Sequence, residues 1–254
     1  EGHGEATIDT LWNEYVPKHL LTRLHGYELL MAPYAIAHLK VGLKLYETGY
    51  RFRSDERARV YLTNALEPAE DYSGTFDFAI PALAHEADAV NAIKKASRFA
   101  AVIGNPPYAG HSLNNQVAWI VDKVYDYKRG YPDLQKAGQA KWLQDDYVKF
   151  LRFAEWQIER ASRGVIGFIT NHAWLDNPTF KGMRRHFLES FDRLSILDLH
   201  GNANKKERAP DGTPETGLVL LPFTGWSEDR YEAGVHLYTF SPSVTFSLAS
   251  SGSS

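Results

Sequence analysis

The sequence predicts an α/β fold, in which helices cover both faces of a mainly parallel sheet. Segments with apolar residues at helical spacing alternate along the chain with short segments rich in β-branched and aromatic residues. Two of the short segments, 100–104 and 164–170, are almost continuously apolar, which is typical of strands buried on both faces. Strands that alternate with helices in this way usually lie parallel in one sheet.

The individual elements follow from the same patterns. We expect helices over residues 6–23, 31–46, 78–99, 142–161 and 179–191. We expect strands over residues 24–28, 59–64, 100–104, 164–170 and 194–199, with a further strand within 216–222. The third of these strands ends at Asn105-Pro106-Pro107-Tyr108, because neither proline can donate a ladder hydrogen bond.

The composition is that of a globular chain. Of its 254 residues 44% are hydrophobic, and 28 basic against 31 acidic side chains give a net charge of −3. This excludes collagen-like, disordered and disulfide-rich classes. The chain has no cysteine, so it has no disulfide, thiolate metal site or cysteine nucleophile. We expect a cytoplasmic protein with one domain over 1–240 and a Ser-rich, disordered tail over 241–254.

Candidate site residues lie where strands end, because ligands of an open parallel sheet bind at the carboxyl ends of its strands. Glu28 ends the first expected strand, and Asn64 ends the next. A carboxylate in the position of Glu28 commonly accepts hydrogen bonds from the ribose of a nucleoside cofactor. Taken alone, Glu28 is also consistent with a solvated acid that caps the following helix.

The tetrapeptide Asn105-Pro106-Pro107-Tyr108 is the most informative motif. At average residue usage it would occur by chance in about one such chain in a thousand. Two prolines stiffen the backbone, so the Asn105 amide oxygen and the Pro106 carbonyl can accept from a single amine. The flat ring of Tyr108 can stack on a planar base. A rigid turn without chemistry is the alternative interpretation.

The sequence resembles the amino-methylating DNA methyltransferases that use S-adenosylmethionine, whose motif is Asn, Asp or Ser, then Pro-Pro, then an aromatic residue. The resemblance is to the adenine-specific type, and within it to the methyltransferase region of type ISP single-polypeptide restriction-modification enzymes. It spans about residues 11–212. It is carried by Gly26 to Lys40, Tyr61 to Glu67, Gly104 to Tyr108 with Gly110-His111-Ser112, Trp142 to Phe150, Ile169 to Arg184, and Leu197 to Asn202.

The resemblance implies a Rossmann-like methyltransferase fold and a direct transfer mechanism. Tyr108 would stack on an adenine flipped out of double-stranded DNA, while Asn105 and the Pro106 carbonyl hold its exocyclic amine toward the methyl group of S-adenosylmethionine. Glu28 would hold the ribose of that cofactor, with Asn105 also bordering the cofactor site. Asn64 would face the cofactor's adenine, at a position where the family more often has an acid.

The sequence departs from the family at its two ends. The first strand and the glycine-rich loop that bind the methionine moiety are missing, and the strand would lie between those of Glu28 and Asn105. We therefore expect a gap at the centre of the sheet, with unpaired backbone groups on both sides. The target-recognition domain is missing too. We interpret the chain as a fragment that depends on upstream and downstream segments of a larger restriction-modification polypeptide.

Other sequence patterns give less information about function. The ten histidines include no helical metal-site spacing, so we expect no metal. The basic loop 205–208 could meet phosphates or be merely solvated. The Trp and Tyr residues over 142–158 are interpreted as core. Two alternatives to adenine methylation stay open: a catalytically incompetent interaction or DNA-docking module, and a methyltransferase that acts on another amine, such as a protein glutamine.

Overall fold

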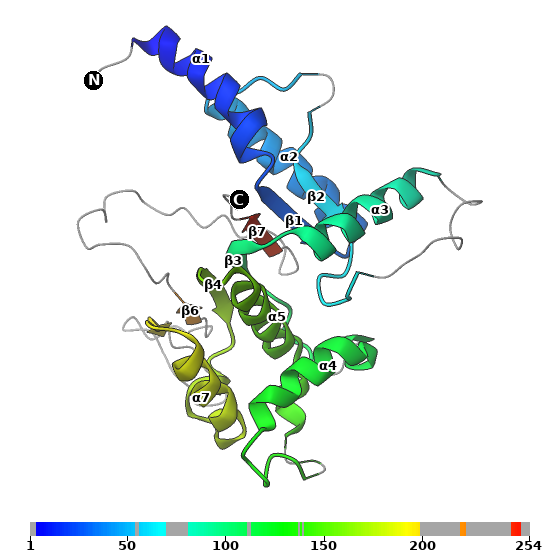
Figure 1. Cartoon of the computed structure of the whole chain (residues 1–254), viewed down its shortest axis with the longest axis vertical. Helices are drawn as coiled ribbons and strands as arrows, with labels where there is room; N and C mark the ends of the chain where they lie inside the picture. Colours follow the sequence, from blue (N-terminus) through cyan, green and yellow to red (C-terminus); the bar gives the residue numbers. More distant parts are fainter. Residues whose placement is uncertain are drawn as a thin grey trace, which may run out of the picture.

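The computed structural model describes residues 4–53, 56–69, 81–110, 113–136, 138, 140–198, 219–221 and 245–249. Its centre is a seven-stranded sheet in the order β2-β1-β7-β3-β4-β6-β5 (Figure 1). The strands are β1 (Leu24–Glu28), β2 (Arg59–Leu62), β3 (Phe99–Gly104), β4 (Val165–Thr170), β5 (Leu197–Asp198), β6 (Val219–Leu221) and β7 (Thr245–Ala249). The predicted α/β class is confirmed, and each expected strand is present within two or three residues of its predicted bounds.

The helices also follow the sequence pattern, with two short additions, α4 and α6. They are α1 (Glu5–Tyr15), α2 (Met31–Glu47), α3 (Pro81–Ala96), α4 (Ala118–Tyr125), α5 (Asp146–Ala161), α6 (Ala173–Asp176) and α7 (Lys181–Ser190). Shorter helical turns are η1 (Val16–Leu20), η2 (Leu113–Gln116), η3 (Asp126–Lys128), η4 (Lys141–Gln144) and η5 (Pro178–Phe180). The sequence analysis predicts no helix where η2 and α4 lie, because eight residues are too few for a clear helical period.

Parallel pairing holds for two strand pairs of the sheet. Strand β1 pairs with β2 and β3 pairs with β4 in parallel, whereas the pairings of β6 and β7 with their neighbours are antiparallel. The expectation of a mainly parallel sheet therefore describes the part that carries the candidate site. Since β1 and β3 both run antiparallel to β7, they run in the same direction, and β1, β2, β3 and β4 end at one edge.

The centre of the sheet is occupied where a gap was expected. Strand β7 lies between β1 and β3, with Thr245 opposite both Tyr27 and Gly104. Residues 245–249 belong to the segment predicted as a disordered tail, and the rest of 241–254 lies outside the described residues. The physical reason is that a slot between β1 and β3 offers unpaired N–H and C=O groups on both sides, which any strand of suitable length can satisfy.

Helices cover both faces of the sheet at β2. Val60 packs in a cluster with Ala37 of α2, and the neighbouring Tyr61 packs in a different cluster with Val90 of α3. Adjacent residues of a strand point to opposite faces, so α2 and α3 lie on opposite sides. This agrees with the expected arrangement for that half of the sheet.

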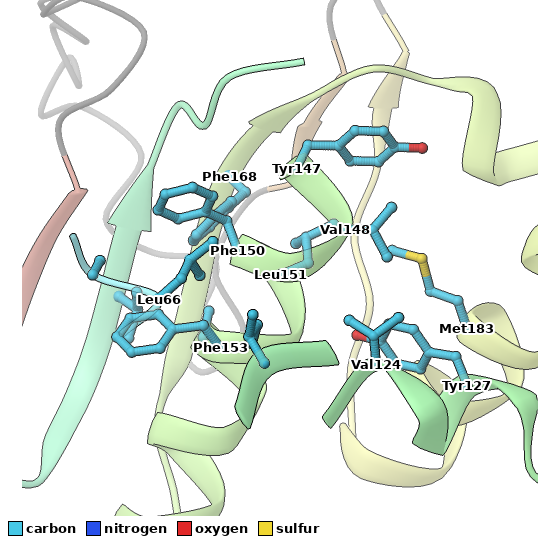
Figure 2. Packing of buried hydrophobic residues seen from close by; sticks show 14 of the residues in the cluster. Leu66, Val124, Tyr127, Tyr147, Val148, Phe150, Leu151, Phe153, Phe168 and Met183 are labelled. Atoms are coloured by element: carbon cyan, nitrogen blue, oxygen red, sulfur yellow. The ribbon is translucent and has the colours of Figure 1, made fainter. Parts of the chain in front are cut away.

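The main core surrounds helix α5, which packs against β3, β4 and α4. Figure 2 shows Phe150 and Phe153 on the side of α5 that faces Phe168 of β4, and Val148 on the side that faces Met183 of α7. Helix α5 is buried over nearly its whole length. The interpretation as core is confirmed for Tyr147, which is buried, and for Trp156, which packs partly buried against this cluster, whereas it is wrong for Trp142 of η4, which is 50% exposed. Among the helices that the structure describes, none combines the length and apolarity that a membrane span requires.

Candidate functional site

The site residues predicted from the sequence gather at the carboxyl edge of the sheet. Glu28 is the last residue of β1, Asn64 follows β2 by two residues, and Asn105 directly follows β3. Because these three strands run in the same direction, the three side chains lie at the same edge. The parallel part of the sheet is thus the element that brings them together.

The Asn-Pro-Pro-Tyr corner leaves the sheet at a position fixed by close packing. Gly104, the last residue of β3, has the ring of Phe168 at 3.0 Å from where a Cβ would lie, so a larger residue would displace that ring. Pro106 is buried, whereas Asn105 and Pro107 are partly exposed. The corner therefore rests on Phe168 and presents its polar groups at the rim.

Within the corner, Tyr108 lies close to Asn105. The Tyr108 hydroxyl lies 3.2 Å from Asn105 Oδ1 and 3.3 Å from the Ile169 carbonyl oxygen, where it donates. The Tyr108 side chain is 44% exposed, so one part of the ring is open to a ligand. An amide oxygen has two lone pairs, and Asn105 Oδ1 can therefore accept from a further donor.

Tyr147 of α5 supports the Tyr108 ring from the protein interior. The two ring centroids lie 6.0 Å apart at an interplanar angle of 68°, which is an edge-to-face contact. Burial, followed by the charge of Asp145, raises the pKa of Tyr108 to about 12. Tyr108 is therefore a neutral aromatic ring at physiological pH, as a stacking platform should be.

Glu28 is a buried acid with one unused oxygen. Its side chain is 1% exposed, and Oε1 accepts from the backbone N–H of Leu30 at 2.8 Å. Oε2 is buried without a hydrogen-bond partner among the described residues. A solvated helix cap is thus the wrong interpretation, and α2 has no side-chain cap. A buried carboxylate oxygen without a partner is costly, and a ligand hydroxyl would satisfy it.

Asn64 has more partners than the sequence predicts. Its Oδ1 accepts from the Leu66 N–H at 3.1 Å, and its Nδ2 donates to Glu67 Oε1 at 3.2 Å and to Asn114 Oδ1 at 2.8 Å. Both amide hydrogens are therefore in use, and one lone pair of Oδ1 remains. Asn64 also lines a pocket of about 300 Å³.

This pocket lies between the ends of β1 and β2 and helix α3. It combines apolar and polar side chains: Leu29, Leu62, Thr63, Asn64, Glu67, Pro68, Ala87, Val90, Asn91 and Lys94. The Lys94 ammonium closes one side, where it donates to Thr63 Oγ1 and to the carbonyl oxygens of Asn64 and Glu67. A volume of about 300 Å³ is at the lower end for a small-molecule site.

The start of α5 holds the loop that follows the corner, which the sequence analysis did not foresee. The Asp146 N–H donates to the Ala109 carbonyl at 3.2 Å. Lys149 is fully buried, and its Nζ donates to Asn115 Oδ1 and the Gln144 carbonyl at 2.6 Å and to Asp146 Oδ1 at 3.0 Å. A lysine on an apolar helix face was the available signal, because a buried ammonium needs several acceptors.

Two further predictions concern metal binding and the basic loop 205–208. The described residues contain no group of three or more His, Asp or Glu that could hold a metal ion. The basic loop 205–208 lies outside the described residues, as do His111 and Ser112.

A buried carboxylate with an oxygen that has no partner among the described residues, a corner with two prolines and a half-exposed aromatic ring thus lie at one edge of the sheet, the edge where α/β sheets bind their ligands. The chain belongs to the Eco57I restriction-modification methylase family, whose model matches residues 27–204. A search of the curated proteins found no match.

Solved structures of larger proteins are similar to this chain. A DrdV–DNA complex matches with 25% identity and a TM-score of 0.59, over 86% of this chain and 22% of DrdV. A nuclease-deletion mutant of the type ISP restriction-modification enzyme LlaGI, in complex with a DNA substrate mimic, matches with 18% identity and a TM-score of 0.61, over 90% of this chain and 17% of that chain.

The ATP-dependent type ISP enzyme LlaBIII bound to DNA matches with 22% identity and a TM-score of 0.57, over 80% of this chain and 14% of that chain. The present chain therefore spans about a fifth or less of these proteins. The predicted resemblance to the type ISP enzymes is confirmed.

Proposed function

We propose that this chain is the catalytic part of an adenine-specific DNA methyltransferase of a restriction-modification system, with a Rossmann-like S-adenosylmethionine site. The observation that carries the proposal is the Asn105 to Tyr108 corner at the carboxyl edge of the sheet, with its partly exposed ring and with a lone pair left on Asn105 Oδ1. Membership of the methylase family and the DNA complexes of the similar proteins support it.

The residues of the corner would hold the base and its amine. Asn105 Oδ1 and the Pro106 carbonyl accept from the two N–H groups of the adenine amine, which turns the nitrogen lone pair away from them. Pro107 keeps the corner rigid, and Tyr108 stacks on the base that has left its duplex. Positioning is the main contribution, because the amine is itself the nucleophile.

The cofactor would lie between Glu28 and the pocket bordered by Asn64. Glu28 Oε2 fits a ribose hydroxyl, because it is a buried acceptor without a partner among the described residues. The pocket beside it, bounded by Leu29 and Asn64, fits a flat base with an amine donor. When bound, S-adenosylmethionine supplies an electrophilic methyl group. The adenine amine held by Asn105 and the Pro106 carbonyl would be positioned to receive that methyl group in place of one of its protons.

The test has a binding part and a transfer part, on the chain as printed and on the longest polypeptide that its gene encodes. Titration calorimetry measures S-adenosylmethionine binding, and nucleoside mass spectrometry detects N6-methyladenine in unmethylated genomic DNA. Asn105→Ala should reduce transfer by at least a hundredfold and leave cofactor affinity within about twofold. Glu28→Gln should weaken cofactor binding instead.

Several outcomes would contradict the proposal. Transfer that survives Asn105→Ala would show that the corner is not catalytic. Methylated cytosine in place of adenine would contradict the base assignment, and methylated glutamine in a protein substrate would support the alternative amine. Intact folding without cofactor binding in both polypeptides would favour the docking module, for which the exposed Leu39, Leu43 and Tyr46 of α2 supply an apolar face.

A further inference from the structure

Asn64 is placed between the pocket and the loop that follows the catalytic corner. Its Nδ2 donates at 2.8 Å to Asn114 Oδ1, which is 50 residues away in sequence and belongs to η2. The same side chain borders the pocket beside β1 and β2, whereas Asn114 is not part of the pocket lining. One amide therefore touches both the expected cofactor site and the loop that carries on from Tyr108.

The orientation of the Asn64 amide is fixed by its neighbours. The Leu66 N–H can only donate, so the Asn64 oxygen must face it, and the nitrogen then faces the Glu67 and Asn114 oxygens. An aspartate at this position could accept from Leu66 but could not donate to either oxygen. The hydrogen bond from Asn64 to Asn114, which we call the bridge, therefore requires the donor groups of an asparagine. This requirement accounts for the absence of the acid that the family more often has at this position.

The loop is held at a second point by α5. Lys149 Nζ donates to Asn115 Oδ1 at 2.6 Å, next to Asn114, and the Asp146 N–H fixes Ala109 at the other end. Both contacts come from the main core. The Asn64 contact is different, because it joins the loop to the outer, β2 side of the sheet.

We propose that Asn64 is a positioning residue that couples the two parts of the active site, so that occupancy of the pocket orders residues 113–117, the described stretch that contains Asn114. This rests on the proposed function, since the pocket's ligand is taken to be S-adenosylmethionine. The remaining lone pair of Asn64 Oδ1 faces the ligand's amine, and its Nδ2 holds Asn114. Asn105 and Tyr108, at the start of this loop, then receive the base in a fixed geometry.

The main test breaks the bridge on the loop side, away from the pocket. Asn114→Ala should speed amide hydrogen exchange over residues 113–118, where the Val117 N–H donates to the Asn114 carbonyl, by roughly fivefold, as expected for one neutral hydrogen bond. It should also weaken S-adenosylmethionine binding by a similar factor in calorimetry. Asn114→Asp keeps an acceptor for Asn64 and should restore both values.

Two further variants separate the bridge from the pocket. Asn91→Ala removes a side chain from the pocket lining that takes no part in the Asn64–Asn114 hydrogen bond, so it should change cofactor affinity and leave exchange over 113–118 unchanged. Asn64→Ala combined with Asn114→Ala should not speed exchange beyond the faster single variant, because both remove the same bond.

The outcomes are distinguishable from failure of the proposed function. Exchange over 113–118 that is unchanged in Asn114→Ala would overturn the bridge, and unchanged cofactor affinity in that variant would overturn the coupling. If no protein binds S-adenosylmethionine, the wild type included, the proposed function and the coupling both fail, whereas the exchange measurement still decides whether Asn64 orders the loop.

Discussion

Helices α5 and α2 are both amphipathic and of similar length, but the structure treats them differently. Helix α5 is buried from Asp146 to Ile158 with the exception of Trp156. Helix α2 buries Ala37 and Leu45, and leaves Leu39, Leu43 and Tyr46 more than half exposed. A helical spacing of apolar residues therefore predicts that a helix forms, but it does not predict how much of that helix other elements will bury.

The two helices also differ in where their charged side chains lie, which is inside the core for α5 and at the surface for α2. Helix α5 carries Lys149, Arg152 and Glu155 inside the core. Arg152 lies 2.9 Å from both Asp126 Oδ2 and Glu159 Oε1, and Glu155 Oε2 accepts from the Tyr127 hydroxyl at 2.5 Å. Helix α2 has instead the exposed pair Lys44–Glu47 at 3.2 Å. Buried charges persist because each has partners, whereas the surface pair is screened by water.

The largest expected effect comes from a cavity in the core beside α5. Phe168→Ala should lower the free energy of unfolding by about 3–5 kcal/mol, because the ring is 1% exposed and packs over Gly104. The matched change on the other helix, Leu39→Ala, removes a side chain that is 61% exposed and should cost no more than about 0.5 kcal/mol.

Urea denaturation followed by circular dichroism measures both values. Similar losses in the two variants would mean that α2 is covered as fully as α5, and would remove the contrast between the two regions.

A second comparison concerns the ion pairs. Arg152→Met should cost about 3 kcal/mol, because it removes the guanidinium beside the fully buried Glu155 carboxylate and leaves Asp126 with Arg129 as its remaining cation among the described residues. Lys44→Met breaks an exposed pair and should cost less than about 1 kcal/mol. Raising the salt concentration should change the effect of the second substitution and leave the first nearly constant. A salt-sensitive Arg152 effect would contradict the buried network.

The smallest expected effects are pH dependences of opposite sign at two histidines, His186 beside α5 and His25 of β1. The hydrogen bond to Glu155 raises the pKa of His186 above 6.5, so its stabilisation is present below pH 6.5 and is lost as the pH rises through the folded value. Burial, followed by the charge of Arg59, lowers the pKa of His25 to about 4. The unfolded chain therefore binds more protons there, and stability is lost as the pH falls from 6.5 to about 4.

Denaturation from pH 4.5 to 8.5 tests both signs. His186→Gln should flatten the decline above pH 6.5 and leave the acid side unchanged, and His25→Asn should do the reverse. A His186 variant that alters the acid side instead would contradict the assigned link to Glu155.

The α/β class, the strands that end at Glu28 and just before Asn105, and the position of the proline corner could all be predicted from the residues alone. These features are local, since prolines stop a strand and apolar runs define buried ones wherever they occur. Sequence analysis also identified Glu28 as a candidate, although the choice between a cap and a ligand needed its burial.

Only the tertiary structure decided which side chains meet. Three features join segments that are far apart in the chain. They are the hydrogen bond between Asn64 and Asn114, the hydrogen bond from Lys149 to Asn115, and the position of β7 between β1 and β3. No periodicity or spacing records such pairs, because long-range contacts are selected by which hydrogen-bonding groups the completed sheet leaves unpaired.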